Sequence, residues 1–76
     1  MHKDILRQLV RAAVEGSGFP SLGEQETDGY LRYLLSRGIP AKASYWNRNT
    51  RKILAVVKIT HRSREIDAEI DQILNG

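Results

Sequence analysis

The stretch AKASYWNRNTRKILAVVKIT, residues 41–60, decides the fold of this chain of 76 residues. Its two halves are rich in β-branched and aromatic residues, which favour strands. The segment NRNT between them offers two asparagines, which tolerate the positive φ of a tight turn. We therefore expect an antiparallel β-hairpin. With a turn at Arg48 and Asn49, Trp46 pairs with Arg51 and Tyr45 pairs with Lys52, and a longer four-residue loop would shift this register.

The second strand of this hairpin is apolar on both of its faces. One face carries Ile53, Ala55, Val57 and Ile59, and the other carries Leu54 and Val56. A strand of this kind needs cover on both sides. Because two strands and a few short helices supply little cover, we expect a homodimer in which sheets or hairpins meet.

Three amphipathic helices are expected around the hairpin, over residues 4–15, from 27 or 28 to 37, and from near 63 to 74. Their apolar faces are Ile5, Leu6, Leu9, Val10, Ala13 and Val14, then Tyr30, Leu31, Leu34 and Leu35, then Ile66, Ile70, Ile73 and Leu74. The chain is therefore predicted to be one small α+β domain, residues 1–76, in the order helix, helix, strand, strand, helix.

Capping residues define several ends of these helices. Asp4 and Ser63 suit the N-cap positions of the first and third helices. Gly38 suits a left-handed C′ residue, Ile39 can cover the last turn, and Pro40 prevents continuation, which predicts a Schellman stop.

The connection over residues 16–28 contains several glycines and a proline. Phe19 and Leu22 are expected to enter the core from it. Ser21 and Glu24 have the spacing of a capping box, which allows a short helical turn to start there.

Charge is strongly segregated along the chain. Nine of the twelve bases and none of the nine acids lie between Asp28 and Glu65, so this span carries +9 although the net charge is +3. The third helix carries the like-charge pairs Glu65–Glu69 and Asp67–Asp71 at i, i+4 spacing, which favours a cation nearby.

A basic hairpin with aromatic residues near its tip predicts a small, non-enzymatic nucleic-acid-binding protein. DNA and RNA are both open as targets, and the size is typical of regulatory proteins of bacteria, phages and plasmids. The expected contact surface consists of Lys42, Trp46, Arg48, Arg51, Lys52 and Arg62.

Two alternatives explain the same charge. The surface could steer an acidic protein partner, as in a small inhibitor or adaptor, or the bases could keep a self-assembling homodimer soluble. An alternative interpretation of Trp46 is that it is a packed residue of the fold, with Arg51 lying over its ring.

The sequence lacks the residue patterns that metal sites, disulfides and catalytic sites need. The chain has no cysteine and two distant histidines, which excludes disulfides and cysteine-based zinc sites. His61 and Ser63 form the one pairing reminiscent of a catalytic site, and helix capping accounts for Ser63. No enzyme activity, cofactor, metal or membrane contact is expected, and the absence of an export signal points to the cytoplasm.

In outline, the order of elements and the basic hairpin resemble winged-helix and excisionase-like DNA-binding domains. The strand that usually precedes a winged helix's recognition pair is not evident in the sequence.

Overall fold

The computed structural model describes the backbone of residues 2–17, 19–20, 22–48 and 52–76, and the side chains of 2–17, 22–44 and 56–76. The described elements are α1 (Lys3–Glu15), β1 (Phe19–Pro20), α2 (Glu24–Ser36), β2 (Ala41–Arg48), β3 (Lys52–Ile59) and α3 (Arg64–Asn75). The predicted α+β class is confirmed, with the helix, helix, hairpin, helix order that the sequence indicates.

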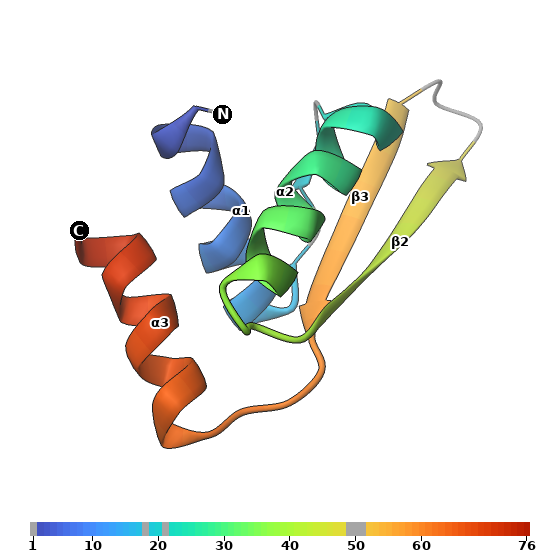
Figure 1. Ribbon diagram of the computed structural model, residues 1–76. Helices are drawn as coiled ribbons and strands as arrows, with labels where there is room; N and C mark the ends of the chain where they lie inside the picture. Colours follow the sequence, from blue (N-terminus) through green and yellow to red (C-terminus); the bar gives the residue numbers. More distant parts are fainter. Residues whose placement is uncertain (1, 18, 21, 49–51) are drawn as a thin grey trace.

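The molecule has two layers. The strands form an antiparallel sheet in the order β1-β3-β2. Helix α1 packs on β3 and α2 packs on β2 and β3, and both lie on the same side of the hairpin (Figure 1). Helix α3 packs against α1 at the side away from the sheet. The helices described here therefore cover one face of the sheet.

The register of the hairpin differs from the expected one. The pairs are Tyr45 with Ala55, Trp46 with Leu54 and Arg48 with Lys52. The expected pairs of Trp46 with Arg51 and Tyr45 with Lys52 were wrong. Arg48 belongs to β2 rather than to the turn, and Asn49 and Arg51 lie outside the described residues.

Hydrophobic burial explains this register. Ala41 pairs with Ile59 and Ala43 with Val57, so apolar residues of both strands share the face toward the helices. The expected register, which differs by an odd number of residues, would have turned Val57 and Ile59 to the opposite face. Val57 is only 2% exposed, so the helices select the observed pairing.

Strand β1 is a short element that the sequence did not indicate. Phe19 pairs with Ala55 and Pro20 with Leu54. Proline has no N–H to donate, and it is accepted here because β1 lies at an edge of the sheet. This strand sits where the winged-helix resemblance lacked one, but a single helix, α2, follows it before β2.

Two helices begin earlier than expected. The N-cap residue of α1 is His2 rather than Asp4, and Asp4 lies in the first turn. Helix α2 begins at Glu24, and the buried Thr27 donates its backbone N–H and its hydroxyl to the Gly23 carbonyl. The capping box expected at Ser21 lies outside the described residues.

The end of α2 is the Schellman stop that the sequence predicts. The Ile39 N–H donates to the Leu34 carbonyl at 2.9 Å, and the Gly38 N–H donates to the Leu35 carbonyl at 3.0 Å. Gly38 has φ of +79°, and Ile39 is fully buried. This stop turns the chain directly into β2.

Replacing Gly38 by alanine should destabilise the fold by roughly 1–2 kcal/mol, because a Cβ is disfavoured at positive φ. Gly29 provides the matched control, since it lies within α2, without positive φ, and a Cβ there meets no atom within 4 Å. Gly29→Ala should stabilise the fold by roughly 0.5–1 kcal/mol. Urea denaturation measures both changes, and a loss of stability in Gly29→Ala would contradict this account of α2.

The core lies between the helices and the covered face of the sheet. Its buried apolar residues are Leu6, Leu9, Val10, Ala13, Leu22, Tyr30, Leu34, Ile39, Ala41, Val57, Ile70 and Ile73. Leu22 enters it as predicted, whereas the side chain of Phe19 is outside the description. Val14 and Leu35 were expected on buried faces but are 40% and 50% exposed.

Helix α3 matches its prediction closely. The Ser63 hydroxyl oxygen accepts from the Ile66 N–H at 3.2 Å, which is the predicted N-cap. Ile70 and Ile73 are buried, and Ile66 and Leu74 pack against them. The buried stripe of α3 is therefore the one that helical spacing indicates.

Candidate functional site

One face of the sheet is covered by none of the described helices and gathers basic residues. In β2, the buried Ala41 alternates with the exposed Lys42 and Ser44, and in β3 the buried Val57 alternates with the exposed Lys58. We call this side the open face. Its described side chains are Lys42, Ser44, Val56 and Lys58.

Lys42 and Lys58 are direct cross-strand partners on the open face. Like charges placed directly opposite each other destabilise a sheet. Among the residues whose side chains are described, neither lysine forms an ion pair. The pair therefore leaves two cations together and available to an external anion.

The register extends the open face toward the tip of the hairpin. Ser44 pairs with Val56, Trp46 with Leu54 and Arg48 with Lys52. Strand alternation places all of these positions on the same face as Lys42. Four of the predicted site residues, Lys42, Trp46, Arg48 and Lys52, thus share one face, and Arg51 lies outside the described residues.

Arg62 does not join that face. It lies in the segment between β3 and α3, where its Nε contacts the Asp67 Oδ1 at 2.5 Å. The two side chains are 49% and 48% exposed, so solvent screens the pair. Its described contact ties this residue to the first turn of α3.

Lys58 is a member of the open face that was not among the predicted site residues. Its position opposite Lys42 depends on the register of the hairpin, and the expected register gave it no such partner. The signal that could have found it is the apolar pairing of Val57 and Ile59 with the alanines of β2.

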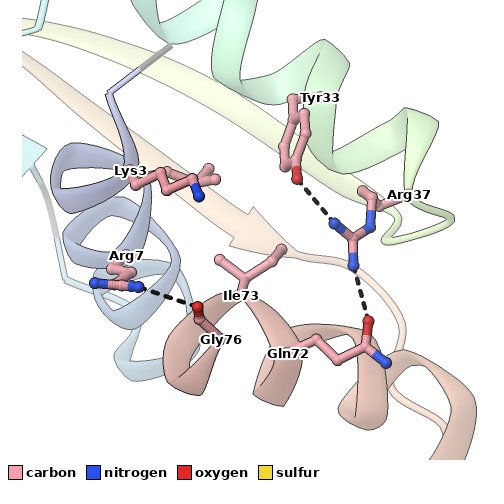
Figure 2. Close-up of a pocket in the computed structure, with 8 residues that line it drawn as sticks. Lys3, Arg7, Tyr33, Arg37, Gln72, Ile73 and Gly76 are labelled. Atoms are coloured by element: carbon pink, nitrogen blue, oxygen red, sulfur yellow. Dashed lines mark hydrogen bonds between the residues drawn. The ribbon is translucent and has the colours of Figure 1, made fainter.

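Arg37, like Arg62, is a cation that lies against the acids of α3. It lies just after α2, and its Nε and Nη2 contact the Glu69 Oε2 at 2.9 and 2.8 Å. Its other donors reach the Tyr33 hydroxyl at 2.8 Å and the Gln72 Oε1 at 3.0 Å (Figure 2). The hydrogen bonds to Glu69 and Tyr33 raise the pKa of the guanidinium above its ordinary value. Arg37 therefore links α2 to α3.

Beside Arg37 lies a pocket of about 160 Å³ between the three helices. Figure 2 shows Lys3 and Arg7 of α1 on one side of it and Tyr33, Arg37 and Gln72 on the other. The Arg7 Nη2 donates to the Gly76 carbonyl at 3.3 Å, and Nη1 lies 3.6 Å from the Asp4 Oδ1. Two of the three cations of this pocket are thus already engaged within the chain.

Among the described residues, no group of three His, Cys, Asp or Glu side chains is placed to hold a metal ion. Ser63, the candidate nucleophile considered beside His61, is occupied as a helix cap. Nor does any helix in the described part of the chain reach the length and hydropathy that crossing a bilayer requires.

No model of a protein family, no curated protein and no solved structure matches the chain.

Proposed function

We propose that this chain is a small non-enzymatic nucleic-acid-binding protein that places the open face of its sheet on the phosphate backbone. The observation that carries the proposal is the Lys42–Lys58 pair, which is exposed and has no described counter-ion. A polyanion relieves the repulsion between two such cations, and each lysine that neutralises a phosphate releases a counter-ion.

The distribution of the acids supports the same orientation. The acids of the first helical turns are Asp4 in α1, Glu24 and Glu26 in α2, and Glu65 and Asp67 in α3. Helices α1 and α2 lie on the covered side of the sheet, and α3 packs against α1 farther from the sheet. The open face, in contrast, carries Lys42 and Lys58 and, by register, the positions of Arg48 and Lys52.

Salt dependence of binding tests the proposal. With about four phosphates neutralised, log K should fall against log salt with a slope of roughly −3 for single strands and −4 for duplex. Fluorescence anisotropy with labelled oligonucleotides, measured from about 50 to 200 mM salt, gives this slope. Absence of binding at micromolar protein in the lowest salt, to duplex and single strand alike, would overturn the proposal.

Poly-glutamate is the control for an acidic protein partner. If it displaces the oligonucleotide at equal charge concentration, the face recognises acidic surfaces in general and the protein-interaction alternative gains support. Displacement only by nucleic acid supports the proposal. Sedimentation of the free protein tests the expected homodimer in the same buffers.

A further inference from the structure

The open face differs in chemistry between its ends and its middle. One end carries the Lys42–Lys58 pair, and the register places Arg48 opposite Lys52 at the other end. The two pairs between them are apolar or weakly polar, Ser44 with Val56 and Trp46 with Leu54. Val56 is half-buried and Ser44 is exposed, so this middle section begins at the surface of the molecule.

From this arrangement we infer that the open face binds single-stranded nucleic acid in preference to duplex, with a base stacked at Trp46. The inference rests on the proposed function, since it names the kind of nucleic acid that the same face takes. At about 3.3 Å per residue, position 46 lies roughly 13 Å from Lys42 and roughly 7 Å from Arg48 along β2. A nucleic-acid strand that runs along β2 would therefore meet phosphate-binding residues, Lys42 and Arg48, on either side of the stacking position at Trp46.

The middle of the face is poorly suited to reading a duplex. Base edges in a groove are read by Arg, Lys, Asn, Gln and similar polar side chains. Here the central positions are Ser44, Trp46, Leu54 and Val56, of which only serine can serve in this way. Bases in a duplex stack on one another, whereas an unpaired strand exposes base faces to aromatic side chains.

The described helices are poorly suited to contact base edges in a groove of duplex nucleic acid. A recognition helix contacts base edges with its N-terminal residues. Each described helix instead carries acids in its first turn, such as Asp4, Glu26 and Asp67. Carboxylates at these positions repel phosphates, which leaves the sheet as the surface for the nucleic acid.

Trp46 makes the inference directly measurable, because it is the one tryptophan of the chain. Indole fluorescence, excited at the red edge of its absorption, should be quenched when oligothymidylate of about 12 nucleotides binds. An abasic sugar-phosphate strand of equal length carries the same charge without bases. It should bind at least about tenfold more weakly than oligothymidylate and leave the fluorescence unchanged.

Substitutions at Trp46 separate the contribution of base stacking to binding from the contribution of charge. Trp46→Leu should weaken single-strand binding by about tenfold and weaken duplex binding much less, whereas Trp46→Phe should retain most of the single-strand affinity. Circular dichroism confirms that each variant is folded. If Trp46→Leu does not fold, the abasic strand on the wild-type protein still decides the question.

The outcomes separate this inference from the proposed function. Equal affinity for duplex, oligothymidylate and abasic strand, without quenching, would overturn the single-strand inference and leave a general phosphate-binding face. Tighter binding to duplex would overturn it as well. Loss of all binding would overturn the inference and the proposed function together.

Discussion

Replacing Lys58 by glutamate is expected to make the protein more stable and to remove most of the proposed affinity for nucleic acid. The substitution turns the like-charge pair with Lys42 into an opposite-charge cross-strand pair, which is worth roughly 0.2–1 kcal/mol. It also places a negative charge where a phosphate is proposed to bind. At roughly 1 kcal/mol per unit charge near an anionic surface, the affinity should fall by about 30-fold.

Arg11→Glu is the matched control for Lys58→Glu. Arg11 is exposed on α1, in the helical layer, and its replacement changes the net charge by the same two units. Screening over about 8–10 Å at physiological salt should limit its effect on binding to a few-fold. If Arg11→Glu weakens binding as much as Lys58→Glu does, the open face is not the interface.

The double variant Lys42→Glu, Lys58→Glu completes the test. It restores a like-charge pair, now negative, so its stability should return toward that of the wild type. Its affinity for nucleic acid should fall by roughly a further 30-fold below that of the single variant. Urea denaturation and anisotropy on the same samples therefore separate the effect on folding from the effect on binding.

Replacing Leu34 by alanine should remove a large part of the stability of the fold. Leu34 is fully buried in α2, and truncating a buried leucine typically costs about 2–5 kcal/mol. A domain of this length is stable by roughly 4–11 kcal/mol in total, so a substantial unfolded fraction is expected on mild heating.

Leu35 is the matched control, because it is the next residue of the same helix and is 50% exposed. Leu35→Ala should change the free energy of unfolding by less than about 1 kcal/mol, since little of the side chain leaves a packed environment. Denaturant midpoints followed by circular dichroism compare the two variants. Equal losses in both would contradict the placement of Leu34 at the centre of the core.

Features set by neighbouring residues were predictable from the sequence. The Schellman stop at Gly38 and the N-cap at Ser63 each depend on a few adjacent positions, and both are present. The buried stripe of α3 follows from helical spacing alone. The acids of α3 also predicted a neighbouring cation, although not that it would be Arg37, 32 residues away from Glu69.

Features set by distant packing were not predictable in the same way. The hairpin register follows from the burial of Val57 beneath the helices, which turn propensities do not report. Strand β1 is defined by its pairing with β3. A segment of two residues is too short to show an alternating pattern that would predict a strand from the sequence. Leu34 and Leu35 are equally apolar, and only the orientation of α2 on the sheet decides which one is buried.

The position of α1 has a consequence for how the chain folds as it is synthesised. The partners of α1 are β3 and α3, both of which come much later in the chain. An isolated helix of 13 residues is marginal in water, so the growing polypeptide keeps Leu9 and Val10 uncovered until those segments emerge. Contacts of such long sequence separation slow folding, and a ribosome stalled before Ile73 should hold a chain that proteases and chaperones still recognise as unfolded.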